Sequence, residues 1–169
     1  LAAAGVTDTA GNSGPASAFT AATALTLDRV GPAVSAFSSA VSSPTNSTSI
    51  DYTLSFGETV SGIEAADLAN AGTATGCVFA PSASAASSVT VTVTGCSASG
   101  SLTPRLLAGS VTDALGNAGP AAAADATTTL ALDRVAPSVS AFTSTHTSPT
   151  NATSIAFTLT FDGPVTGLA

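Results

Sequence analysis

The sequence predicts an all-β protein built from a repeated unit, and two patterns carry this prediction. Apolar residues alternate with polar ones over several short stretches, and no helical stripe longer than two turns occurs. Residues 1–64 also align without a gap with residues 106–169, which gives 36 identical positions at an offset of 105 residues. A unit of this length is the size of one sandwich domain and exceeds the roughly 20 to 50 residues of a solenoid repeat, so each unit should have its own core.

The edges of the repeat are predicted from a proline motif. The sequence Asp-Arg-Val-x-Pro ends at Pro32 and occurs again ending at Pro137. A proline fixes φ and lacks an N–H donor, so a strand cannot continue unbroken through it. We therefore expect residues 1–30 to be the last two strands of one repeat, residues 31–135 to be a complete repeat, and residues 136–169 to open a third. On this interpretation the chain is a segment of a longer protein.

Seven segments of the complete repeat have the composition and alternation of strands. They are Val34–Phe37, Thr48–Phe56, Thr59–Ile63, Thr73–Ala80, Val89–Thr94, Leu102–Leu107 and Thr127–Leu132. Alternation predicts two buried faces, formed by Ile50, Tyr52, Leu54 and Phe56 in one strand and by Val89, Val91 and Val93 in another. Residues 64–68 should form one helical turn. Seven short antiparallel strands in about 105 residues predict an immunoglobulin-like seven-strand β-sandwich.

Short phrases of the sequence are similar to a known class of repeats. Residues 111–117 read VTDALGN, residues 133–137 read DRVAP and residues 56–62 read FGETVSG. These phrases resemble the bacterial Ig-like repeats of biofilm-associated surface proteins and large adhesins. The resemblance implies a stalk that lifts a binding head away from the cell wall, and calcium bound at domain junctions. The third copy departs from the pattern, because Asp162 lies one position earlier than the place of Glu58.

Composition and charge exclude several classes of function. Ala, Ser and Thr make up more than half of the chain, and three arginines face ten carboxylates for a net charge of -7. Nucleic acids and acidic membrane surfaces are bound through clustered Lys and Arg, so we expect no nucleic-acid partner. No apolar run reaches the roughly 20 residues of a membrane helix, and we expect no membrane insertion of this segment.

Cys77 and Cys96 are the only cysteines in the sequence. A hairpin that turned between Ala86 and Ser87 would place them opposite each other, and a disulfide there would imply an oxidising, extracellular setting. Strict alternation would then turn Phe79 toward solvent unless Gly95 formed a bulge. The alternative is a pair of buried free thiols.

Acidic residues gather at the predicted junctions between repeats. Successive antiparallel strands should bring the domain edge, the loop at Glu58 and the loop at Asp113 to one end of the sandwich. Calcium takes about six to eight oxygen ligands from carboxylates, carbonyls and water, so we predict a calcium site at each junction. The candidate ligands are Asp28, Glu58, Asp113, Asn117, Asp133 and Asp162. The alternative is loop chemistry, in which Asp113 and Asn117 bond their own backbone and Asp28 pairs with Arg29 or caps an edge.

The sequence contains no recognisable catalytic arrangement. His146 is the sole histidine and aligns with Val41 of the complete repeat, so it cannot anchor a repeated catalytic triad. Glu64 and Asp67 lie on one predicted turn and not across a substrate cleft. We therefore expect no enzyme, and interpret the chain as a spacer or stalk segment of a secreted or cell-surface bacterial adhesin-type protein, packed against neighbouring repeats of the same chain. Two alternatives stay open, namely a self-assembling extracellular filament in which identical chains exchange strands, and an Ig-like module that binds a glycan or a protein.

Overall fold

The structure is a computed structural model that describes residues 1–168. The chain forms two compact units, the first spanning Leu1–Val30 and the second beginning at Gly31. We refer to residues 1–30 as the N-terminal segment, to residues 31–135 as the core segment and to residues 136–168 as the C-terminal segment. Every buried hydrophobic side chain of the described residues lies between Phe37 and Leu132, inside the core segment. The protein is essentially all-β, as the sequence predicts.

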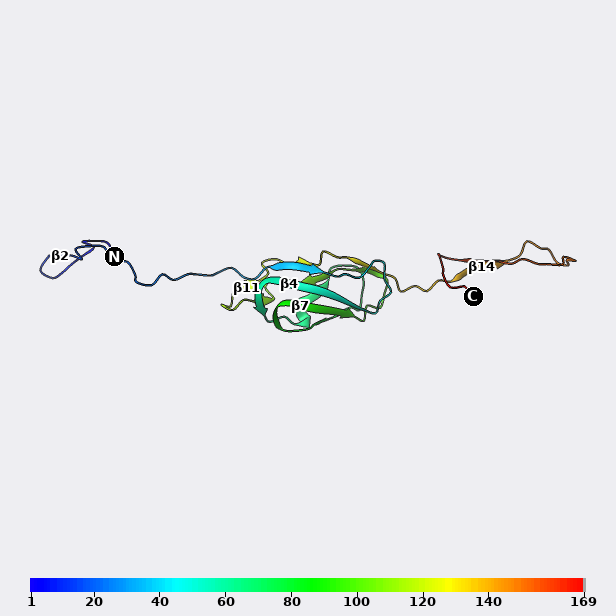
Figure 1. Cartoon of the computed structure of the whole chain (residues 1–169), viewed down its shortest axis with the longest axis horizontal. Coiled ribbons are helices and arrows are strands. Elements are labelled where there is room, and N and C mark those ends of the chain that lie inside the picture. Colours follow the sequence, from blue (N-terminus) through cyan, green and yellow to red (C-terminus); the bar gives the residue numbers. More distant parts are fainter. Residues whose placement is uncertain (169) are drawn as a thin grey trace. The chain divides into compact units, whose positions relative to one another are not determined.

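The largest sheet is organised around strand β4, which pairs antiparallel with three other strands. Figure 1 shows β4 and β7 as long neighbouring arrows. Two further strands extend the sheet beyond these neighbours. The six strands are β3 (Val34–Ser38), β4 (Ser49–Ser61), β6 (Val78–Pro81), β7 (Ala85–Thr94), β10 (Val111–Thr112) and β11 (Ala118–Gly119).

Two smaller sheets contribute to the same core. They consist of β5 (Leu68–Asn70), β9 (Pro104–Leu106) and β12 (Ala124–Asp125) in one sheet, and β8 (Gly100–Leu102) and β13 (Leu130–Leu132) in the other. A single 3-10 turn, Ala65–Asp67, precedes β5 and confirms the predicted helical turn. The hydroxyl of Tyr52 on β4 lies 3.4 Å from the Leu102 carbonyl oxygen and 3.3 Å from that of Thr128, so it links the large sheet to β8 and to the segment that precedes β13.

The alternation in β4 and β7 produces the predicted buried faces. Ile50, Tyr52, Leu54 and Phe56 are buried, and so are Val89, Val91 and Val93, whereas the threonines between these valines are exposed or half-buried. Removing each of the larger side chains from water contributes roughly 1.5 to 3 kcal/mol. The ring of Phe37 from β3 packs edge-on against Tyr52, with 6.0 Å between the ring centroids.

The terminal segments contain strand pairs that repeat those of the core segment. In the N-terminal segment β1 (Val6–Thr7) pairs with β2 (Ser13–Gly14), and in the C-terminal segment β14 (Val139–Thr143) pairs with β15 (Thr158–Phe161). Each pairing recurs in the core segment at an offset of 105 residues, together with the same irregularity in the longer pair. The corresponding pairs are Val6 with Gly14 and Val111 with Gly119, and Phe142 with Leu159 and Phe37 with Leu54.

The turn predicted around Glu58 is wrong, because the two strands on either side of it form one strand, β4. Pairing with β7 shifts between Ser55, which lies opposite Ser88, and Val60, which lies opposite Ala86. The additional residues of β4 are accommodated in this irregular stretch, as in a β-bulge. Residues 57–59 are exposed and have the polar or small side chains common in turns. The pairing of β4 with its neighbours before and after this stretch keeps it extended within the strand.

Other predicted boundaries also differ from the observed ones. The strand predicted from residue 102 to 107 is divided between β8 and β9, because Pro104 cannot donate to a ladder. The strand predicted to begin at Thr73 begins at Val78. The connection predicted after Leu107 contains the paired strands β10 and β11, and β5 was missed. These strands have two or three residues each, too few to display an alternating pattern.

Cys77 and Cys96 form a disulfide, as predicted, and the alternative of two free thiols is wrong. The turn predicted at Ala86 lies inside β7. Phe79 pairs with Val93 and is buried, so alternation does not expose it. No bulge is needed, because β7 ends at residue 94 and Gly95 follows with a φ of +72°, a left-handed backbone that favours glycine.

We predict that replacing both cysteines, Cys77→Ser with Cys96→Ser, lowers the free energy of unfolding by roughly 3 kcal/mol, the loop-closure value for a disulfide enclosing about 20 residues. Urea denaturation followed by circular dichroism measures this change. As a control, dithiothreitol should weaken the wild type to the level of the variant and leave the variant unaffected. Equal stability of variant and oxidised wild type would contradict the prediction.

We also predict an unusual alkaline titration of Tyr52. Burial raises the pKa of this phenol to about 12, above the value of about 10 in an unfolded chain. Stability associated with the neutral phenol is therefore complete below pH 10 and is lost as the pH rises toward 12. Since Tyr52 is the only tyrosine and the chain has no tryptophan, tyrosinate absorbance reports on this side chain alone. Ionisation near pH 10 with an intact circular dichroism spectrum would show that the phenol is not buried.

Candidate functional site at the two ends of the core segment

The chain enters the core segment beside the C-terminal end of β4. Val34, the first residue of β3, pairs with Phe56, and the preceding residues Gly31 and Pro32 lie against β11. A Cβ atom at Gly31 would lie 1.9 Å from the Ala118 carbonyl oxygen, so only glycine permits this approach. We call this region the incoming end.

The chain leaves the core segment beside the opposite end of β4, where Thr45 lies four residues before Ser49, the first residue of that strand. The Thr45 N–H donates to the Ala131 carbonyl at 2.9 Å, and the Asp133 N–H donates to the Thr45 carbonyl at 3.0 Å. The last strand is therefore fastened to the loop that leads into β4. We call this region the outgoing end.

Arg134 stabilises the outgoing end by donating hydrogen bonds to backbone carbonyl oxygens. Its guanidinium donates to the carbonyl oxygens of Asn46 and Ser47, the latter at 2.7 Å, and its backbone N–H donates to the Ser99 hydroxyl at 2.9 Å. Sequence reasoning missed this role. The sequence does contain a signal for it: arginine stands at the same place in both Asp-Arg-Val motifs, although the whole sequence has three cationic side chains.

Asp113 organises the loop between β10 and β11. One carboxylate oxygen accepts the N–H groups of Leu115 and Asn117, both at 2.8 Å, and the other accepts the Asn117 side-chain amide at 2.7 Å. The amide of Asn117 lowers the pKa of Asp113 below its usual value, backbone N–H groups add to this, and burial opposes it. Asp8 makes the equivalent bonds with Asn12 in the N-terminal segment. This geometry corresponds to the loop-chemistry alternative.

The predicted calcium ligands are distributed as follows. Glu58 is an exposed residue of β4 and not a loop residue. Asp28 and Asp133 each accept the N–H group two residues later, both at 3.0 Å. Throughout residues 1–168, no three His, Cys, Asp or Glu side chains gather closely enough to hold a metal ion.

Asp133 and Asp162 are the two candidates that line a common pocket, together with Pro137 and its neighbours. Asp162 also accepts the N–H of Ser138 at 3.0 Å and its hydroxyl at 2.6 Å, which lowers the pKa of this carboxyl group. Two carboxylates supply at most four of the about six to eight oxygens that calcium takes, so backbone carbonyls and water would have to complete the shell.

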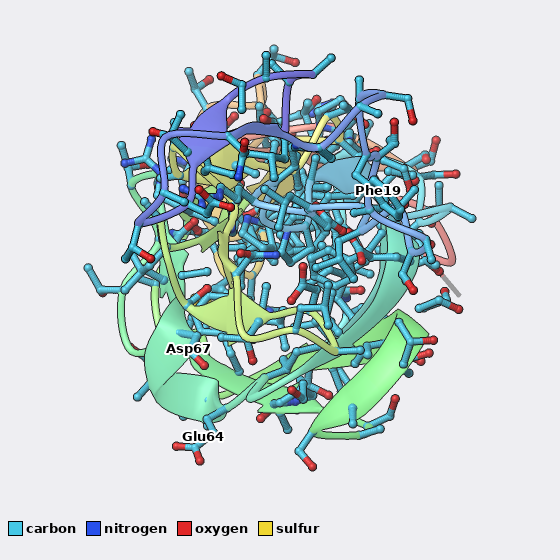
Figure 2. The ribbon with its side chains drawn as sticks, turned by 90° about the vertical axis from the view of Figure 1, so that its left-hand side faces the viewer. Phe19, Glu64 and Asp67 are labelled. Atoms are coloured by element: carbon cyan, nitrogen blue, oxygen red, sulfur yellow. A yellow bond between two sulfur atoms is a disulfide. The ribbon has the colours of Figure 1, made fainter. Side chains whose placement is uncertain are left out.

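The discounted catalytic candidates have structural roles. Asp67 accepts the Glu64 N–H at 2.8 Å and so caps the 3-10 turn. Figure 2 shows the Glu64 side chain projecting outward from this turn, with Asp67 on the same turn. His146 is exposed and contacts the Ser144 hydroxyl.

Comparison with models of known protein families finds no match for this chain, and comparisons with curated proteins and with solved structures find none either. Among the described residues, no helix has the length and apolar character needed to cross a membrane.

We predict that Asp113→Ala destabilises the core segment at neutral pH. The loop N–H groups favour the ionised carboxylate, so its contribution is present above the unfolded pKa of about 3.9 and is lost as the pH falls through the lower folded value. The difference in unfolding free energy between wild type and variant should therefore shrink below about pH 4. Asp8→Ala is the matched control, because it breaks the same loop bonds outside the hydrophobic core. An equal loss of core stability in both variants would refute this assignment.

Proposed function

We propose that the chain is a run of tandem immunoglobulin-like sandwiches that serves as a spacer or stalk segment of a secreted or cell-surface bacterial protein. The observation that carries this proposal is the position of the two chain ends in the core segment. The chain enters at one end of β4 and leaves at the other. Connections at opposite ends of a unit allow repeats to be joined in series, which a spacer requires.

The outer faces of the strands support a mechanical role. Several hydroxyl groups bond to one another between neighbouring segments of the chain and so join these segments. The pairs are Ser55 with Ser88 at 3.0 Å, Ser61 with Thr112 at 3.1 Å and Thr103 with Thr129 at 2.8 Å. The sequence contains no lysine, so arginine is the one residue type at which trypsin-like proteases can cleave it.

The distribution of aromatic side chains favours a spacer over a module that binds glycans or proteins. Binding surfaces for such partners are enriched in exposed Tyr, Trp and Phe. All four aromatic residues of the core segment are buried, namely Phe37, Tyr52, Phe56 and Phe79. The disulfide is consistent with an oxidising extracellular setting, where such bonds persist.

Calcium is a separate element of the proposal. Asp133 belongs to the outgoing end and Asp162 to the following repeat, and both line one pocket. A calcium ion held there would reduce the repulsion between the two carboxylates and stiffen the joint. Asp28, Glu58, Asp113 and Asn117 stay predicted ligands only.

Small-angle X-ray scattering of arrays with two, three and four complete repeats tests the spacer function. We expect the maximum dimension to rise by roughly 40 Å per repeat, the length of a 13-residue strand at about 3.3 Å per residue. A dimension that stays constant as repeats are added would disprove the spacer. Addition of a chelator should shorten arrays whose joints contain Asp133 and Asp162, and Asp162→Asn should abolish that response. A chelator without effect would remove calcium from the proposal and leave the spacer intact.

A further inference from the structure

The first and last stretches of the core segment are paired, and they run in the same direction. Thr45 and Leu132 form a parallel bridge, and further hydrogen bonds continue this pairing on both sides of it. We call residues 34–47, which begin with β3, the entry stretch. We call residues 127–134, which contain β13, the exit stretch.

Hydrogen bonds join the two stretches along most of their length. The first is the bond from the Thr127 N–H to the Phe37 carbonyl oxygen, at 2.8 Å. The bonded residues advance together along both stretches, which is the pattern of a parallel pair. In order, they are Phe37 with Thr127, Ser39 with Thr128, Ser43 with Ala131, Thr45 with Ala131 and Asp133, and Asn46 and Ser47 with Arg134.

Each stretch is also anchored in a different sheet. Strand β3 of the entry stretch pairs with β4 in the large sheet, and β13 of the exit stretch pairs with β8 in a two-stranded sheet. The side chains of Phe37, Leu130 and Leu132 are buried in the common hydrophobic cluster. Sliding one stretch along the other would therefore break the hydrogen bonds between them and draw these side chains out of the core.

The positions of the chain connections determine how tension acts on this pair. The chain enters ahead of Val34 and leaves after Arg134, so a pulling force draws the entry stretch toward its N-terminal end and the exit stretch toward its C-terminal end. In a parallel pair these two directions are opposite. The hydrogen bonds run between the stretches, across the direction of sliding, so all of them bear the load together. A pair pulled apart from one end would lose its bonds one after another.

We propose that the hydrogen bonds between the entry and exit stretches form a clamp through which the core segment bears tension along the chain. This inference rests on the proposed spacer function and adds resistance to a pulling force, which a spacer does not need merely to be long. Arg134 is the strongest part of the clamp. Its guanidinium donates to two main-chain oxygens, and hydrogen bonds from a charged donor are roughly twice as strong as neutral ones.

Optical-tweezers measurements on the full chain, tethered by its two ends, test the proposal, because forced unfolding reports the unfolding rate. At a fixed force, Arg134→Ala should speed unfolding of the core segment roughly tenfold or more, the effect of losing a charge-assisted hydrogen bond. Ser43→Ala, which removes one hydroxyl acceptor of the clamp, should act in the same direction. Circular dichroism checks that each variant is folded.

Arg105→Ala is the matched control. Arg105 pairs with Asp125, and both residues lie outside the two stretches, so this variant should unfold under force at nearly the wild-type rate. The unfolding step of the core segment is identified by its length. Cys77→Ser with Cys96→Ser should lengthen it by roughly 60 Å, because the 19-residue separation that the disulfide closes is then free to extend.

A second tether distinguishes a clamp from a general gain in stability. It holds the chain by its N-terminus and by an attachment at position 115, an exposed residue in the loop between β10 and β11 at the incoming end. The force then pulls the entry stretch but not the exit stretch. At the same force the wild type should unfold faster in this geometry than between its two ends, and Arg134→Ala should have a smaller effect.

Two results would overturn the clamp. One is an equal unfolding rate of the wild type in the two pulling geometries, and the other is an equal acceleration of unfolding by Arg134→Ala and Arg105→Ala. Either result, together with repeat arrays that lengthen in X-ray scattering, would refute the clamp and leave the spacer standing. Arrays that do not lengthen would instead refute the spacer.

Discussion

Burial of one face of β4 is the constraint on which the rest of the structure depends. The strand pairs with β3, β7 and β10 along its length, and its alternate side chains fill the centre of the hydrophobic cluster. A chain in which Ala, Ser and Thr predominate has few large side chains to bury, so the position of each one matters. Tyr52 is the clearest case, because its side chain is fully buried and its hydroxyl reaches the carbonyl oxygens of Leu102 in β8 and of Thr128. Register errors of one residue would expose this whole face.

The ends of the core segment follow from the same strand. Backbone contacts fasten the incoming chain near one end of β4 and the outgoing chain near the other. Side chains at these ends are mostly satisfied within the chain itself, as Asp113 is by its own loop and Arg134 by main-chain carbonyls. Asp113, one of the predicted ligands, therefore also holds the backbone of its own loop. These contacts are consistent with the proposed mechanical link between units.

The core segment buries the apolar faces of its strands, whereas the terminal segments leave apolar side chains exposed. Each terminal segment forms one strand pair that the core segment also forms, yet only in residues 31–135 are the apolar faces of the strands buried. A strand pair without its cover keeps its register, since backbone bonds and turn residues hold it, but leaves its apolar face in solvent.

The all-β class, the two buried faces of β4 and β7, the disulfide and the 3-10 turn followed from the sequence alone. Each depends on alternation or on residue chemistry within one segment, which a single chain displays directly. The continuity of β4 through Glu58, the paired strands after Leu107 and the role of Arg134 were decided only by the tertiary structure. In each case the deciding partner is distant in sequence: neighbouring ladders hold a polar stretch extended, and main-chain oxygens from another loop receive the guanidinium. A local sequence pattern does not identify partners that are distant in sequence, so the tertiary structure is needed to find them.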